Sequence, residues 1–196
     1  ALGWLWFVNL FNFMDGIDGI SGVEAVAIGG GLCLVALVGG MGDGAGLYAL
    51  IVAMAALGFL PWNWHPARIF LGDVGSVTLG YLIGWLLLGA AAAGFWAAAL
   101  LLPLYYLADA TLTLFSRLRR REPVWQAHRK HYYQRAIRRG IGQRAVVGAV
   151  TALNGLLMGA ALLSLTGGLG VLAGLVIGAL SVIGVLWYFR GSSGDY

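Results

Sequence analysis

Apolar runs of close to twenty residues recur along this chain, and short polar stretches separate them. Twenty residues of α-helix rise about 30 Å, which matches the hydrocarbon core of a bilayer. The pattern therefore predicts an all-α fold, a polytopic transmembrane helical bundle of about six spans, with the end of an earlier apolar run before Asn9. The second run is short for a complete crossing. The predicted spans are 22–40, 46–61, 74–92, 94–115, 145–166 and 168–189.

The composition agrees with a membrane location. Hydrophobic residues make up 60% of the 196 residues and charged residues only 10%. Soluble domains carry about 25% charged residues, so this chain has too few polar groups to cover a water-soluble globule of its size. Close packing of helices in lipid accounts for most of the 32 glycines. The single cysteine, Cys33, lies in an apolar run, so no disulfide can form within the chain.

The charges predict which loops share a side of the membrane. Ten of the twelve Lys and Arg residues fall in the stretch 116–144, and the bias of basic loops places this stretch on the cytoplasmic side. Alternation of the spans brings the polar stretches 9–21 and 62–73 to the same side. We therefore expect three polar loops to converge on one face. The ten residues are Arg117, Arg119, Arg120, Arg121, Arg129, Lys130, Arg135, Arg138, Arg139 and Arg144.

The stretch NLFNFMDGIDGIS, residues 9–21, combines amide and carboxylate side chains with glycines. Asn9 and Asn12 are three residues apart, so a helical turn directs both to one side, and Asp15 and Asp18 repeat the step. The intervening glycines let the backbone turn and approach a ligand. Such oxygen ligands suit Mg²⁺, which typically takes one or two carboxylates together with substrate phosphates. Solvated turn residues are the alternative explanation.

The second polar stretch reads PWNWHPARIFLGDVGS, residues 61–76, and ends where a predicted span begins. An acid at the edge of a span is a functional candidate, because a carboxylate near lipid is costly unless it is paired. Asp73 is therefore a candidate cation ligand. A capping role is the alternative, since Asp73 or Ser76 could satisfy free N–H groups at the start of the span.

The third stretch contains HRKHYYQR within a basic loop. Attraction to anionic lipid explains the cluster at 117–121 but explains His128 and His131 less well, because histidine adds little charge at neutral pH. Two histidines beside Arg129 can instead donate to phosphate oxygens, and a nucleic-acid partner is not expected. Acids for a cation and bases for phosphates on one face fit phosphoryl transfer from a diphosphate-activated, soluble donor to a lipid acceptor.

Together the motifs NxxNxxDGxDG, PARIFLGDVGSVTLG and HRKHYYQR, in this order, resemble those of the polyprenyl-phosphate N-acetylhexosamine-1-phosphate transferases, glycosyltransferase family 4. The HxxHxYQR form is similar to bacterial members that initiate O-antigen or other surface glycans, more than to the peptidoglycan-precursor branch. The resemblance implies that undecaprenyl phosphate attacks the β-phosphate of a UDP-N-acetyl-sugar and releases UMP. It also implies Mg²⁺, with Mn²⁺ as a substitute, and an active site on the cytoplasmic face of the bacterial inner membrane. A homodimer is left open.

The resemblance also assigns positions in this chain to the metal and the nucleotide. Asn12 and Asp73 match positions of the metal site. Asp18 and Asn63 match positions near the uracil, and Phe70 matches an aromatic residue that stacks on that base. For Phe70 a position facing lipid is the alternative.

Catalytic roles are expected for Asp15, in the nucleotide-facing motif, and for Asp73. His128 and His131 match the late loop that approaches the diphosphate and the sugar, and we expect them to act in catalysis. Arg129, between them, is expected to bind the substrate.

One departure from the family pattern is clear. The family carries an Asp-Asp pair on an earlier cytoplasmic loop, and no such pair occurs in this sequence. The motifs present belong to the C-terminal part of the pattern. We therefore expect residues 1–196 to form a single membrane-embedded domain, the C-terminal part of a longer chain. The alternative function is a non-enzymatic polyprenyl-phosphate-binding or transporter-like membrane protein that keeps the phosphate-binding loops.

Overall fold

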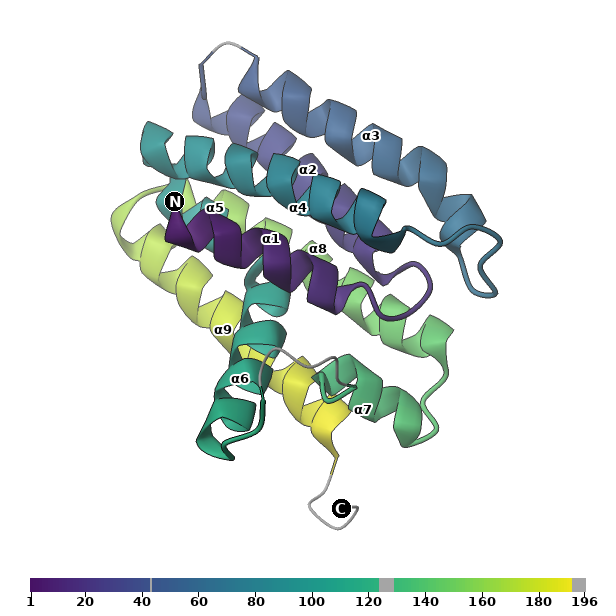
Figure 1. The fold of residues 1–196 in the computed structure, drawn as a ribbon. Coiled ribbons are helices and arrows are strands. Elements are labelled where there is room, and N and C mark those ends of the chain that lie inside the picture. Colours follow the sequence, from purple (N-terminus) through teal and green to yellow (C-terminus); the bar gives the residue numbers. More distant parts are fainter. Residues whose placement is uncertain (43, 124–128, 192–196) are drawn as a thin grey trace.

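The computed structural model describes residues 1–42, 44–123 and 129–191, and every regular element in them is helical (Figure 1). This confirms the predicted all-α class. The elements are α1 (Leu2–Met14), α2 (Ile20–Gly39), α3 (Ala45–Asn63), α4 (Gly72–Ala90), the π-helical turn η1 (Ala91–Phe95), α5 (Trp96–Leu101), α6 (Leu104–Arg119), α7 (Tyr132–Arg138), α8 (Gln143–Ser164) and α9 (Gly168–Arg190).

Five helical segments in the described part of the chain are long and apolar enough to cross a membrane. They are α2, α3, the run from α4 through α5, α8 and α9. The ends of α2, α3, α4, α8 and α9 fall within a few residues of five predicted spans, because the length of an apolar run is a property of the local sequence. The chain is a multi-pass membrane protein.

The predicted span at 94–115 differs from the structure, which has no single helix there. The chain bends at Gly94, whose φ of 98° is a conformation that side chains other than glycine rarely adopt. The helix is then interrupted before Pro103, which lacks an N–H and cannot continue a helical ladder. As a result α6 runs across the direction of the neighbouring helices (Figure 1).

Helix α2 packs against both α3 and α8, with α9 packed on α8 and α1 packed on α4. Small residues permit the closest approach. A Cβ atom at Gly29 of α2 would lie 2.8 Å from the carbonyl oxygen of Ala49 on α3. Glycine therefore lets the two backbones meet, as expected for helices packed in lipid.

One polar contact crosses the interior of the bundle. Asn154 of α8 donates from Nδ2 to Oε2 of Glu24 on α2 over 2.8 Å, and the Glu24 side chain is fully buried. The amide satisfies one oxygen of an acid that would otherwise be costly to bury. The contact links α2 to α8.

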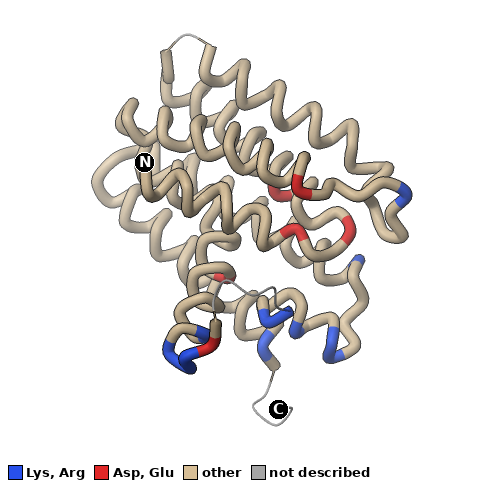
Figure 2. The backbone as a smooth tube through the Cα atoms, viewed as in Figure 1, with Lys and Arg blue, Asp and Glu red and all other residues tan. Residues whose placement is uncertain are grey.

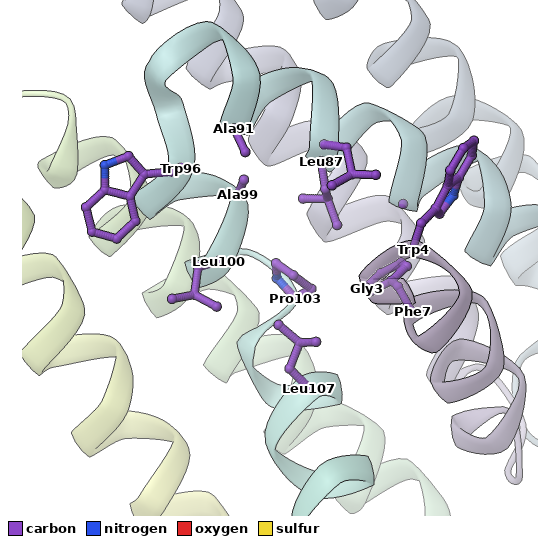
Figure 3. A pocket seen from close by; sticks show the side chains of 12 residues that line it. Gly3, Trp4, Phe7, Leu87, Ala91, Trp96, Ala99, Leu100, Pro103 and Leu107 are labelled. Atoms are coloured by element: carbon purple, nitrogen blue, oxygen red, sulfur yellow. The ribbon is translucent and has the colours of Figure 1, made fainter. Parts of the chain in front are cut away.

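An apolar cavity of about 260 Å³ lies between α1, α4 and the bent segment that follows, at the N-terminal end of α1 (Figure 3). Trp4, Leu87, Trp96 and Leu107 are among its lining residues. The two indole nitrogens are the only polar side-chain atoms among the lining residues, so this cavity offers no charged group to a phosphate.

Candidate active site

The loop between α1 and α2 (residues 15–19, the first loop) is joined to the loop between α3 and α4 (residues 64–71, the second loop) by Asn63. This side chain is buried at the end of α3. Its Oδ1 accepts from Gly19 N over 2.9 Å, and its Nδ2 donates to Ile69 O over 3.0 Å. Asn63 is predicted to lie near the nucleotide, and in the structure its amide forms hydrogen bonds with both loops.

Asp18 makes a second connection between the same loops. Its Oδ2 accepts from the backbone N–H of Ala67 over 3.1 Å and lies 2.7 Å from Nδ1 of His65. No hydrogen bond to its other oxygen is found among the described residues. Asp18 thus orders the second loop with one oxygen and keeps the other for a ligand.

These two loops enclose a cavity of about 240 Å³. It combines two carboxylates, a buried amide and an aromatic ring, and Phe70 is 73% exposed, so its face is open to a ligand. The structure thus brings together four of the predicted site residues. The lining residues are Asp15, Gly16, Ile17, Asp18, Asn63, Phe70, Leu71 and Gly72.

Asn12 and Asp73 flank this cavity without lining it. Ser76 donates from Oγ to Asn12 Oδ1 over 2.6 Å, which joins the last turn of α1 to the first turns of α4. Helix α4 begins without a capping side chain, so the capping alternative for Asp73 and Ser76 is not what the structure shows. The contact brings Asp73, one turn before Ser76, towards Asp15, one turn after Asn12.

The two carboxylates influence each other. Burial is the main cause that raises the pKa of Asp15, and the nearby Asp73 carboxylate raises it further, while a hydrogen bond with Ser21 acts in the opposite direction. Like charges held close together disfavour ionisation unless a cation compensates them. The pair is therefore a place where a divalent cation would be stabilising.

The donor set fits Mg²⁺ only in combination with a substrate. Within the described ranges, no group of three His, Cys, Asp or Glu side chains lies close enough to hold a metal ion. Mg²⁺ usually keeps several waters and takes one or two carboxylates plus substrate phosphates. Asp15, Asp73 and the Asn12 carbonyl would hold an ion that also binds a diphosphate.

Asp109 on α6, which the sequence motifs did not single out, holds the end of the third loop (residues 120–131) at His131 and the start of α7. Its fully buried carboxylate accepts hydrogen bonds from α6 itself and from the segment that begins α7. A lone acid inside the apolar stretch 94–115 was the signal that could have found it. The donors are Tyr105 Oη, Thr113 Oγ1, His131 Nδ1, Tyr132 N and Tyr133 N.

Of the predicted residues on the third loop, His131 is buried and Arg129 is exposed. His131 lies 3.1 Å from Asp109, and its ring stacks on Tyr133. His128 lies outside the described residues. Any contact of His131 with substrate would use Nε2, because Nδ1 faces Asp109.

Part of the basic character of this loop is compensated internally. Lys130 Nζ lies 2.7 Å from Glu122, and Arg117 donates to the same carboxylate over 3.3 Å. The hydrogen bond with Lys130 is the main cause that lowers the pKa of Glu122, and Arg117 adds to it. Most basic positions lie at the end of α6, on α7 and at the start of α8, whereas most acidic positions of the described residues lie where α1, α2 and α4 end or begin (Figure 2).

Helix α7, which follows the third loop, meets the first loop at Tyr133. The buried Tyr133 hydroxyl lies so close to Gly16 that a Cβ atom there would collide with it. Burial raises the pKa of Tyr133, and the carboxylates of Asp109 and Asp15 raise it further. In the first turn of α8, Arg144 donates from Nη2 to the His65 carbonyl over 2.9 Å. Segments of all three polar loops therefore converge in the structure.

Comparison with known proteins agrees with this architecture. Residues 1–91 match the sequence family described as Glycosyl transferase family 4. A Bacillus subtilis protein named "Probable undecaprenyl-phosphate N-acetylglucosaminyl 1-phosphate transferase" is 31% identical over 160 residues, covering 74% of this chain and 44% of its own length. A Streptomyces coelicolor protein named "Putative glycosyltransferase SCO3672" is 34% identical and covers 97% of this chain and 47% of its own length.

A shorter stretch of the chain is also similar to a protein with a different name. A Dichelobacter nodosus "Phospho-N-acetylmuramoyl-pentapeptide-transferase" is 38% identical over 86 residues, covering 37% of this chain and 24% of its own length. The chain spans about half the length, or less, of the curated relatives it matches.

Proposed function

This chain belongs to glycosyl transferase family 4, and from that premise we propose that it forms part of an enzyme that transfers a sugar-1-phosphate from a UDP-sugar to a polyprenyl phosphate. In the reaction, an oxygen of the lipid phosphate forms a bond to the β-phosphorus of the donor. The bond from that phosphorus to the oxygen bridging it to the α-phosphate breaks, and UMP leaves. The products are a lipid diphospho-sugar and UMP.

One observation carries this proposal: Asp15, Asp18 and Phe70 line a single cavity, and the Ser76–Asn12 contact brings Asp73 towards it. The oxygen of Asp18 that does not hold the second loop can accept from the N–H of a uracil. The exposed ring of Phe70 offers a face on which the base can stack. The nucleotide would thus be held at one end of the cavity.

The other end of the site is suited to the diphosphate. Asn12, Asp15 and Asp73 would hold Mg²⁺, which when bound neutralises charge that develops on the phosphates. Arg129 of the third loop would bind the sugar-phosphate. His128 and His131, on either side of it, would act in catalysis. Transfer then depends mainly on positioning and on electrostatic stabilisation.

For the donor we propose an N-acetylhexosamine and for the acceptor undecaprenyl phosphate, as the first membrane step of a cell-surface polysaccharide such as O-antigen. The names of the relatives include both an N-acetylglucosaminyl and an N-acetylmuramoyl-pentapeptide transferase. The HxxHxYQR form of the third loop favours the former. The concentration of ten basic residues in the stretch 116–144 supports a cytoplasmic site in a bacterial inner membrane.

The test is an assay of UMP release in membranes that carry the full-length protein. We expect release only when undecaprenyl phosphate, Mg²⁺ and a UDP-N-acetylhexosamine are all present, and no release with UDP-N-acetylmuramoyl-pentapeptide. Release from the pentapeptide donor alone would assign the chain to the other branch. Binding of labelled undecaprenyl phosphate without UMP release from any donor would instead support the non-enzymatic alternative.

A further inference from the structure

Asp109 is a fully buried acid in a bundle whose interior is mostly apolar, and five donors converge on its two carboxylate oxygens. Burying a carboxylate is costly, and hydrogen bonds to the charged form are what offset the cost. The hydrogen bonds that offset the cost of burying Asp109 also fix the positions of the groups that donate them.

Two donors belong to the same face of α6 as Asp109, since Tyr105 and Thr113 lie four residues before and after it. The other three come from the start of α7: the His131 ring at 3.1 Å, Tyr132 N at 3.0 Å and Tyr133 N at 3.4 Å. Helix α7 has only seven residues, too few to be stable alone. Helix α7 also packs on α8 and α9, and Asp109 holds its first turn.

The position of α7 in turn affects the site. Tyr133, in the first turn of α7, packs against Gly16, the neighbour of Asp15. On the other side, Arg135 donates from Nε to the Lys130 carbonyl over 2.8 Å and so holds the end of the third loop. Asp109 itself does not line the cavity. It can influence the reaction only through the groups it holds.

We propose that Asp109 is a positioning residue for the transfer reaction: by holding His131 and the first turn of α7 it places residues 129–131, and through Tyr133 it braces Gly16 beside Asp15. The reaction named here is the one proposed above. A carboxylate can only accept, so the contact also requires that Nδ1 of His131 carries a proton.

The main test replaces Asp109 with Asn and with Ala in the full-length protein. In Asp109→Asn the carbonyl oxygen can keep the donors on Oδ1, but the charge and the oxygen that accepts from Tyr105 Oη and Tyr133 N are lost. We expect UMP release to fall about tenfold for Asn and about a hundredfold for Ala, which is the range for hydrogen bonds to a charged group. Release is expressed per folded protein, from the melting profile in detergent.

Glu24→Gln is the matched control, because Glu24 is an equally buried acid with one amide partner that glutamine can keep. It should retain release within about threefold. A double-mutant cycle with His131→Ala separates positioning from folding. The losses should be clearly less than additive. Fully additive losses, a loss as large in Glu24→Gln, or a loss that vanishes per folded protein would each overturn the proposal.

A second measurement does not depend on activity. With ¹⁵N-labelled histidine, the His131 signal is assigned by its disappearance in His131→Ala, since the chain has three histidines. It should show the Nδ1–H form in the wild type and in Glu24→Gln, and should change in Asp109→Ala. An unchanged signal overturns the proposal. If the wild type releases no UMP with any donor, the proposed function fails while this spectrum still decides the role of Asp109.

Discussion

At the scale of single residues, the site depends on carboxylates whose surroundings disfavour a negative charge. Asp15 is partly buried beside the like charge of Asp73, and Asp109 is a fully buried acid inside a membrane bundle. Such placements lower the stability of the folded chain and persist where they serve a function. Substitutions that remove charge without changing shape are therefore the most informative.

Asp73→Asn should reduce Mg²⁺-dependent UMP release at least a hundredfold, because the amide keeps the shape but cannot offset the charge of a cation. Insertion into the membrane should be unchanged, since α4 begins without a cap from this side chain. The control is Thr78→Val on the same helix, whose hydroxyl bonds only to Val74 O of its own backbone. Unchanged release in Asp73→Asn would remove this carboxylate from the metal site.

Asp15→Asn should raise the melting temperature at neutral pH in the absence of divalent cations, even though it lowers UMP release. The pKa of Asp15 is raised in the folded chain, so ionising it costs stability as pH rises from the unfolded value of 3.8 to the folded value. The gain of the variant should therefore be smallest at acidic pH and grow as pH rises through that window. A gain that is independent of pH would contradict the assignment.

At the scale of elements, short segments bring the loops together. Asn63 at the end of α3 joins the first and second loops, α6 holds α7, and α7 meets the first loop. These contacts fix the positions of the loops relative to one another at the site. At the third loop, Lys130 pairs with Glu122, whereas the arginines 119 to 121 are exposed.

Gly16→Ala should lower UMP release about tenfold or more, because the added methyl group would displace the buried Tyr133 ring, and overpacking costs about 1–3 kcal/mol. Gly30→Ala is the matched control, since a Cβ atom there meets nothing within 4 Å. Equal behaviour of the two variants would show that the contact between α7 and the first loop does not matter for turnover.

Replacing His128 and His131 together with Ala should reduce release more than neutralising Arg119, Arg120 and Arg121. The three arginines are exposed and attraction to anionic lipid headgroups explains them, whereas the two histidines are expected to act on the substrate. Both variants are compared in the membrane assay and by vesicle binding. The opposite ranking would mean that the third loop serves mainly to attract anionic lipid.

At the scale of the whole molecule, the crossings α2 and α3 separate the first loop from the second, and the contacts of Tyr133 with Gly16 and of Arg144 with His65 bring α7 and the start of α8 to the same region. This arrangement can be tested with single cysteines introduced after Cys33→Ala, because Cys33 is the only native cysteine. Cysteines at exposed Phe70 and Arg129 should be labelled from the cytoplasmic side, and one at Gly42 from the other side. Labelling of positions 70 and 129 from opposite sides would rule out a shared site.

Much of the fold could be predicted because it depends on local properties. Apolar length determines where α2, α3, α4, α8 and α9 cross the membrane, and the concentration of basic residues indicates which loops share a side. The spacing of Asn12, Asp15 and Asp18 predicts a ligand site in the first loop, and the structure places Asp15 and Asp18 in one cavity. These conclusions need only the order of residues.

Tertiary structure alone decided how the loops are held. The roles of Asn63 and Asp109 depend on partners 22 to 44 residues away, as in the contacts of Asp109 with His131 and of Asn63 with Gly19. The break before α6 arises because Gly94 and Pro103 interrupt a run that hydropathy alone treats as one span. Hydrophobic pattern reports how each residue is solvated, whereas hydrogen-bond partners are chosen by the packing of whole helices.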